Sequence, residues 1–424
     1  MGGALVFAVS ATIASLYVLP NIFPAHIGNG YIGAHCILTA LMLLGWARGN
    51  ISVQAILLAG IAARILLFPL PIFTSNDAER YLWDGAVALA GFDPYITAPA
   101  DSVVSSLRSL WATPPEHAAY ATIYPPGALM LFAASALAGP VWGVWIWKGL
   151  ASAASIASLL LMHRILTRRN LSHHLPLFAL SPLLILETGA GAHLDVFLVF
   201  SIVAAFALLD EKRVGFAGAM LGVGAAIKFL PAVLLAPLAL SLSRSQAIRL
   251  CVAGGAVVMA FYGAALAVGY QPIGVLGVFF EKWRFGSPLY SLLTNTFDLQ
   301  TARILLGLIG VILVLVAVRF AFRRDYIFSS MIFLAIPFLL SPVVFPWYLS
   351  VLVPLFAIRP NATVLVWVTV APFSYEVLNK WLSVGEWVPA AWPIWLIGVG
   401  LLAGLVVDLG RYGRGNTLSF GALK

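Results

Sequence analysis

The stretch of sequence that decides the fold is TARILLGLIGVILVLVAV, residues 301–318, in which Arg303 is the only charged side chain. An α-helix of this length rises about 27 Å, close to the roughly 30 Å hydrocarbon thickness of a bilayer. The whole chain has the same character: of its 424 residues, 62% are hydrophobic and 9% are charged, and the mean hydropathy is +0.99. Soluble domains carry about 25% charged residues. The composition therefore excludes a soluble fold and predicts an all-α, polytopic transmembrane helical bundle.

Similar apolar runs recur on both sides of this stretch. The run 214–243 is interrupted by Lys228 and Pro231 and predicts a tight helical hairpin, so we expect about 12–14 membrane segments in all. The first run lacks the charged start and the cleavage pattern of a signal peptide, and we expect it to be a true span. The candidate spans lie at about 4–21, 31–47, 51–73, 141–163, 174–190, 194–209, 214–243, 246–269, 301–318, 326–341, 343–358, 361–377 and 389–408.

The basic residues predict how these spans are oriented. With the N-terminus placed in the cytoplasm, 15 of the 24 Lys and Arg residues fall inside and five fall outside, as the positive-inside rule requires. This orientation requires that the apolar segment 126–139 is not a full span, and its length favours a re-entrant or interfacial helix on the outer face. We therefore predict an integral protein of the plasma (inner) membrane with both termini in the cytoplasm.

The acidic residues have the opposite distribution. Twelve of the 16 fall on or near the outer side, and since carboxylates contribute little to topology, this asymmetry indicates an outward-facing site that uses them. The longest polar stretch is the outer loop, residues 74–122, which has six carboxylates and two arginines. We expect one integral membrane domain, composed of N-terminal spans 1–73, the outer loop with its short helix 74–140, a transmembrane bundle 141–410 and a cytoplasmic tail 411–424.

Several other classes of site are not expected. Cys36 and Cys251 lie in apolar runs, which leaves neither a disulfide framework nor a zinc site. The net charge of +8 comes from residues scattered through short loops, so nucleic acid is not an expected partner. No group of His or carboxylates has clear ligand spacing, and we predict no metal and no other cofactor. Gly218 and Gly222 predict close helix packing.

The outer loop begins with SNDAERYLWDG, residues 75–85. If residues 76–90 are helical, Asp77, Arg80, Tyr81 and Asp84 share one face. A carboxylate there, beside aromatic rings, suits a general base that acts on a sugar or alcohol hydroxyl. The alternative is a solvated helix in which Arg80 pairs with one of the two aspartates.

A series of short motifs follows in a fixed order over about residues 70–360. They are Asp77-x-x-x-Tyr81, Gly91-x-Asp93-Pro94-Tyr95, Tyr124-Pro125-Pro126, Ser181-Pro182 with Glu187 and His193-x-Asp195, Lys228-Phe229-x-Pro231, and Phe345-Pro346-Trp347-Tyr348. In this order they resemble the membrane glycosyltransferases of the C-type fold, and most of all glycosyltransferase family 87 and the catalytic subunit of the GPI mannosyltransferase. The chain departs from them by two extra spans before the loop, where family members often have one.

The resemblance implies a hexosyltransferase of the C-type fold. Such an enzyme takes a sugar, here with mannose as the first choice, from a polyprenyl-phosphate donor and passes it with inversion to a lipid or glycan acceptor on the outer face. By position the catalytic base is Asp77, and Asp84 lies where the GPI enzyme has a second aspartate. The expected partners are membrane lipids and, because the GPI enzyme works with an accessory subunit, a possible accessory subunit here.

The leaving phosphate of such a donor needs cations. Lys228 at the hairpin tip is one candidate, and its alternative role is pairing with Glu187 or Asp195. Lys282 and Arg284 are others, with ordinary headgroup contact as their alternative. For His193 with Asp195 the alternative is a structural hydrogen bond, and for Trp347 it is an interfacial position. The predicted donor- and substrate-binding residues are Arg80, Tyr81, Tyr95, Tyr124, His193, Asp195, Lys228, Lys282, Arg284 and Trp347.

Two other classes of membrane protein compete with this interpretation. A transporter or flippase of lipid-linked sugars should show paired repeats and ionisable residues near the bilayer midplane, whereas here no repeat is visible and most acids lie at the outer edge. A polysaccharide polymerase or ligase would typically have Arg-rich outer loops, whereas the outer loop here is acidic.

Overall fold

The computed structural model describes residues 1–274 and 276–413, so residues 414–424 of the predicted tail lie outside the described residues. In the described part every named element is helical, which confirms the all-α prediction. Seven stretches there are long and apolar enough to cross a membrane. Six contain the helices α1 (Gly2–Ile22), α2 (Ile27–Arg48), α6 (Gly139–Arg168), α12 (Arg244–Ala267), α15 (Leu299–Phe322) and α20 (Trp392–Gly413), and the seventh runs from α18 (Ala362–Val370) through a 3-10 turn to α19 (Leu378–Val384).

Several of the other predicted spans are shorter or broken helices. Proline causes most of the breaks, because it lacks the N–H for an interior helical bond and clashes with the preceding turn. The run 174–190, expected as one span, breaks at Pro182 and ends in a π-helical turn, Glu187–Gly191. The shorter helices are α3 (Val53–Leu67), α7 (Leu175–Ala179), α8 (Pro182–Leu186), α9 (Asp195–Asp210), α10 (Val214–Ile227), α11 (Leu235–Ser241), α16 (Tyr326–Leu340) and α17 (Val353–Ile358).

The hairpin expected at 214–243 is present. Helix α10 ends at Ile227, Lys228 adopts an extended backbone, and the chain returns through a 3-10 turn and α11. A Cβ atom on Gly218 would lie 2.1 Å from the Leu250 carbonyl oxygen of α12, and one on Gly222 would lie 2.5 Å from that of Gly254. These glycines therefore allow the close packing of α10 on α12 that the sequence predicts.

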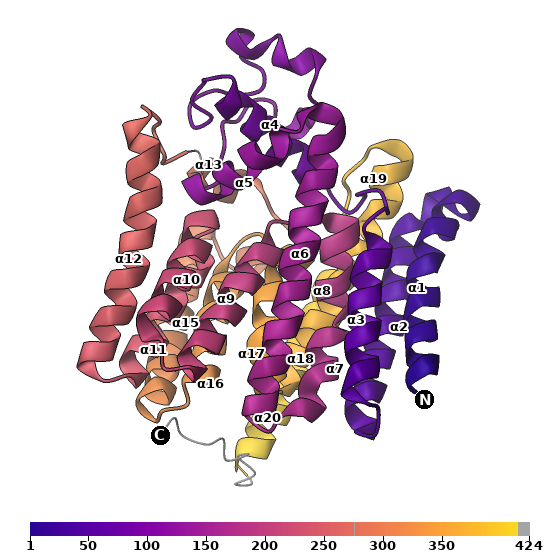
Figure 1. Ribbon diagram of the computed structural model, residues 1–424, viewed down its shortest axis with the longest axis vertical. Helices are drawn as coiled ribbons and strands as arrows, with labels where there is room; N and C mark the ends of the chain where they lie inside the picture. Colours follow the sequence, from indigo (N-terminus) through magenta and orange to yellow (C-terminus); the bar gives the residue numbers. More distant parts are fainter. Residues whose placement is uncertain (275, 414–424) are drawn as a thin grey trace.

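Loop 74–122, which includes one short helix, and two further short helices form a cap over one end of the bundle (Figure 1). The cap contains α4 (Asp77–Leu89), α5 (Pro126–Ala136) and α13 (Leu276–Lys282), and α4 packs directly on α5. A further short helix, α14 (Pro288–Thr296), follows α13 in the chain. Helix α5 has 11 residues, too few to span a bilayer, and its re-entrant or interfacial placement stays a prediction. We call the capped end the cavity end.

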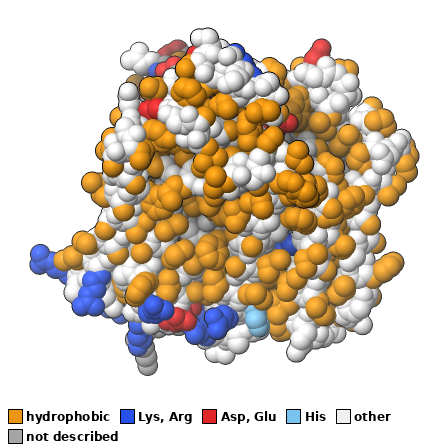
Figure 2. Space-filling model, turned by 45° about the horizontal axis from the view of Figure 1, so that its top comes forward, with side chains coloured by type: hydrophobic (Ala, Val, Ile, Leu, Met, Phe, Trp, Pro, Cys, Tyr) orange, Lys and Arg blue, Asp and Glu red, His pale blue; other side chains and the backbone are white. Residues whose placement is uncertain are grey.

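At the opposite end, α1 begins and α20 ends (Figure 1). Arginines from several helices meet carboxylates there: Arg168 pairs with Glu211, Arg169 with Asp210, and Arg359 with Asp325. We call this the basic end. Figure 2 shows hydrophobic side chains over the middle of the molecule, Lys and Arg gathered along the lower edge and acidic side chains mainly at the upper end. This zoning is what a membrane-spanning bundle requires.

Candidate active site

Helix α4 positions Asp77, its first residue, at the edge of a cavity. The sequence predicts this helix at 76–90, and the structure has it at Asp77–Leu89. A carboxylate in the first turn is favoured by the helix dipole. One turn on, the Tyr81 hydroxyl donates a hydrogen bond to Asp77 Oδ2 over 3.3 Å. The Asp77 side chain is 22% exposed, so one face of it remains open to the cavity.

The cavity has a volume of about 310 Å³ and lies between the cap and the helix ends beneath it. Its wall combines charged and aromatic side chains. Eight residues of the predicted site line it, namely Asp77, Arg80, Tyr81, Tyr124, Asp195, Lys228, Lys282 and Trp347.

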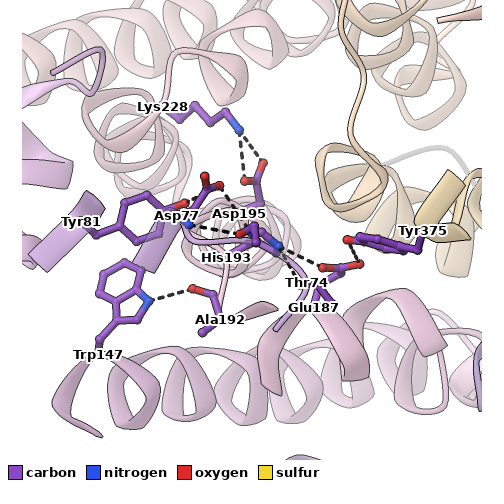
Figure 3. Close-up of polar contacts among 11 residues, drawn as sticks. Thr74, Asp77, Tyr81, Trp147, Glu187, Ala192, His193, Asp195, Lys228 and Tyr375 are labelled. Carbon is purple, nitrogen blue, oxygen red and sulfur yellow. Dashed lines mark hydrogen bonds and ion pairs between the residues drawn. The ribbon is translucent and has the colours of Figure 1, made fainter. Parts of the chain in front are cut away.

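His193 lies directly behind Asp77 and is almost fully buried (Figure 3). Its Nδ1 atom is 3.4 Å from Asp77 Oδ2, and its ring stacks on Trp347 with centroids 3.8 Å apart. Burial alone would raise the pKa of Asp77. The hydrogen-bonding and positive charge of His193, with smaller contributions from His117 and Lys228, outweigh burial and hold that pKa below its usual value. Asp77 is therefore ionised at neutral pH.

Lys228 and Asp195 form an ion pair on the same wall. Lys228 Nζ lies 2.9 and 3.0 Å from the two carboxylate oxygens of Asp195 and sits 3.9 Å from the centre of the Tyr348 ring. Of the two partners predicted for Lys228, the structure selects Asp195. The Asp195 side chain is buried, but that of Lys228 is 29% exposed, so the ammonium retains free hydrogen-bonding capacity toward the cavity.

Asp84 does not line the cavity, although it shares α4 with Asp77. Its Oδ1 accepts a bond from Arg80 Nε at 2.9 Å, and its Oδ2 accepts one from the Thr122 hydroxyl at 2.7 Å. The side chain is 2% exposed. Burial raises the pKa of Asp84, and Arg80 and Thr122 oppose that rise. Both oxygens are engaged within the protein, which is the ion-pair alternative foreseen for this helix.

Two other predicted residues also lie elsewhere. Tyr95 is buried in the cap, with its ring 6.4 Å from that of Tyr270. Arg284 bonds to the carbonyls of Phe280 and Trp283 and lines a separate cavity of about 80 Å³. The structure therefore does not bring these two side chains to the cavity that contains Asp77.

Several lining residues carry no signal in the sequence. Glu116, His117 and Tyr120 come from the far part of loop 74–122, Trp381 comes from α19, and Trp387 comes from the segment between α19 and α20. Burial lowers the pKa of His117, and the nearby Asp77 carboxylate opposes that shift. These residues lie far from Asp77 in sequence, and only the folded cap brings them to it. Within the described residues, no group of three or more His, Cys, Asp or Glu is arranged to hold a metal ion.

The fold and the site define a polytopic helical membrane protein whose polar cavity lies under a cap at one end of the bundle. The pattern of the alpha-(1->6)-mannopyranosyltransferase family, N-terminal domain, matches residues 23–244, just over half of the chain, and the chain belongs to that family. It is an integral membrane mannosyltransferase, and the predicted resemblance to family 87 enzymes is confirmed. The matched region includes Asp77, His193, Asp195 and Lys228. No curated protein and no solved structure matches the chain.

Proposed function

We propose that the protein transfers mannose, with inversion, from a polyprenyl-phosphate donor to a hydroxyl group of a lipid or glycan acceptor on the outer face of the membrane. The family match supports mannose as the sugar. The observation that carries the rest is the open face of Asp77 in a cavity that also contains the Lys228 ammonium. These two groups supply what a single displacement at the anomeric carbon needs.

Asp77 acts as the general base. Its carboxylate takes the proton of the acceptor hydroxyl as the new bond forms between the acceptor oxygen and the anomeric carbon. The bond from that carbon to the phosphate oxygen breaks, and polyprenyl phosphate leaves with the electron pair. Because the acceptor attacks from the face opposite the phosphate, one displacement inverts the anomeric centre. Its lowered pKa keeps Asp77 ionised before the acceptor arrives.

The leaving phosphate is stabilised by cations of the cavity wall. Lys228 is the main one, because Asp195 holds its ammonium at the cavity surface and leaves it 29% exposed. Lys282 lines the rim and donates a hydrogen bond to Tyr120. Phosphate needs no protonation to leave, so cationic contact suffices without a general acid.

The aromatic part of the wall suits the sugar and the first isoprene units. Phe345 and Trp347 are stacked with centroids 4.4 Å apart and an interplanar angle of 4°. Such flat surfaces bind the apolar faces of sugars and prenyl chains by dispersion and by burial of apolar area. Tyr81 and Tyr124 lie edge to face beside them, with centroids 5.3 Å apart.

The zoning of charge supports an outward-facing cavity. The basic end carries Arg168, Arg169 and Arg359, and basic ends of membrane bundles face the cytoplasm. The cavity end then faces outward, and both termini lie inside.

The test is turnover of a labelled donor by the purified protein in nanodiscs. Polyprenyl-phosphate mannose, glucose or arabinose is offered with an extract of host lipids as acceptor. We expect labelled product from the mannose donor in the wild type and none in Asp77→Asn. Movement of lipid-linked sugar across the bilayer without turnover would instead identify a transporter, and product from Asp77→Asn would remove this residue from the role of base.

A further inference from the structure

We infer that Glu187 is a positioning residue for the transfer reaction, acting on Asp77 through the imidazole ring of His193. The inference rests on the proposed function and adds to it a residue that lies outside the cavity. Glu187 lies on the far side of His193 from Asp77 (Figure 3). Its Oε2 atom is 3.3 Å from His193 Nε2, while Nδ1 of the same ring is 3.4 Å from Asp77 Oδ2.

An irregular backbone makes this alignment possible. After α8 the chain forms the π-helical turn Glu187–Gly191, and Ala192 then adopts a left-handed conformation with φ 48°. The His193 N–H donates to the Glu187 carbonyl at 3.1 Å, and Trp147 Nε1 donates to the Ala192 carbonyl at 2.7 Å. A non-glycine residue in the left-handed region costs free energy and persists where its surroundings impose it, most often at functional sites.

Gly191 leaves the space in which the two side chains meet. A Cβ atom on this residue would lie 2.3 Å from His193 Cδ2 and 2.8 Å from Glu187 Oε2. Both side chains are buried, so a methyl group at this position would displace one of them. The missing side chain of Gly191 is therefore a requirement for the contact between Glu187 and His193.

The Glu187 carboxylate is fixed from its other side. Tyr31 and Tyr375 both donate hydrogen bonds to Oε1, at 2.8 and 2.7 Å. This leaves Oε2 for the ring of His193, and the residue as a whole is 4% exposed. Two carboxylates from distant parts of the chain thus face the two nitrogens of one buried imidazole.

The contacts of the His193 ring explain how Glu187 can influence the pKa of Asp77. Within the described residues, neither Glu187 Oε2 nor His193 Nδ1 has a regular hydrogen bond, so the charge contacts to the ring must compensate for their burial. The Glu187 oxygen beside Nε2 holds the ring in the orientation that turns Nδ1 toward Asp77. The other groups that lower the pKa of Asp77 are His117 and Lys228, which contribute less than His193, and Lys228 is also paired with Asp195. Glu187, together with the Thr74 hydroxyl 3.4 Å from Nε2, therefore sets the direction in which the ring faces Asp77.

The experiment compares Glu187→Gln with wild type in the nanodisc assay with polyprenyl-phosphate mannose. The amide keeps an oxygen for Tyr31 and Tyr375 but loses the charge. We expect kcat to fall about 100-fold, as for a misplaced catalytic group, with the donor KM changed less than about threefold. The acid limb of kcat/KM against pH should move to higher pH, because a ring that Glu187 no longer holds gives Asp77 a weaker hydrogen bond, and that hydrogen bond lowers the pKa of Asp77. Glu211→Gln, at the basic end, is the matched control and should keep wild-type kinetics.

Two further variants keep the test decisive if Glu187→Gln folds poorly. Tyr375→Phe loosens Glu187 without removing its charge and should lower kcat severalfold with KM unchanged. Glu187→Gln combined with His193→Asn should be no slower than His193→Asn alone, because Glu187 acts only through the ring. Independent, multiplying losses or an unmoved acid limb would overturn the inference while leaving wild-type transfer intact. A wild type that transfers no mannose would overturn the proposed function and this inference together.

Discussion

The two ends of the bundle use carboxylates in opposite ways. At the basic end, Asp210 receives two bonds from Arg169, at 3.0 and 2.6 Å, and Glu211 receives one from Arg168 at 2.9 Å. At the cavity end, the His193 ring lies 3.4 Å from Asp77 Oδ2, and the Asp77 side chain is 22% exposed. The Asp210 side chain is 9% exposed and both its oxygens bond to arginine, so it has no capacity left for a substrate, whereas Asp77 retains it.

The same contrast occurs within α4. Asp77 and Asp84 lie two turns apart on one helix, but Arg80 and Thr122 occupy both oxygens of Asp84. Both residues are aspartates on the same face of one helix, so the difference in their exposure comes from the groups that the rest of the cap places beside each. Closed carboxylates stabilise the fold, and the open one is available for proton transfer.

The largest effect is expected from Asp77→Asn. The amide has the same shape but accepts no proton from the acceptor, so kcat/KM should fall about 10³-fold, within the usual range for loss of a general base. The measurement is the rate of labelled product formation per mole of folded protein, with folding judged by gel filtration. A loss below about tenfold would mean that Asp77 is no more critical than the closed carboxylates.

Lys228→Gln should have the next largest effect. Loss of a charge-assisted contact to the phosphate costs about 2 kcal/mol, or roughly 30-fold in kcat/KM. The change also leaves Asp195 buried without its cation, so Asp195→Asn in the same background is the control that separates unpaired burial from lost phosphate contact. If the double variant regains wild-type activity, Lys228 serves only to neutralise Asp195.

The sequence predicts the parts of this site that depend on local spacing. The i, i+4 relation of Asp77 to Tyr81 on α4 and the placement of Lys228 at a hairpin tip are both found. Local spacing is sufficient for these two features because each rests on a single helix or on one turn. Orientation in the membrane, predicted from Lys and Arg, stays a prediction.

The rest of the site depends on contacts that no local pattern contains. Thr122, which closes Asp84, is 38 residues away from it, and Tyr375 is 188 residues from Glu187. The choice between Asp77 and Asp84 and the role of Glu187 therefore need the packed structure. The break in the run 174–190 has both kinds of cause. Ser181-Pro182 signals the break, but the residue after the π-helical turn, Ala192, accepts a hydrogen bond from Trp147, 45 residues away.

Asp84→Asn should affect stability and leave catalysis almost unchanged. The variant leaves Arg80 buried beside a neutral amide, and breaking a buried pair in this way costs about 3 kcal/mol. We expect a clear fall in the unfolding temperature measured by thermal denaturation in detergent, with kcat per folded molecule within about twofold of wild type. A selective loss of kcat at unchanged stability would place Asp84 beside Asp77 as a second acid or base.

The smallest effect is expected from Asp210→Asn at the basic end. Its partner Arg169 is 19% exposed and also bonds to the Tyr326 hydroxyl at 2.9 Å, so the guanidinium keeps a hydrogen-bond acceptor and access to water. The loss should be about 1 kcal/mol of stability, as for partly exposed ion pairs, and it should shrink further in high salt because exposed charges are screened. Thermal denaturation at low and high salt measures both. Turnover should be unaffected, since the pair and the cavity lie at opposite ends of the molecule. A fall in kcat here would mean that the two ends are coupled, and that the ion pairs of the basic end do more than hold the helices together.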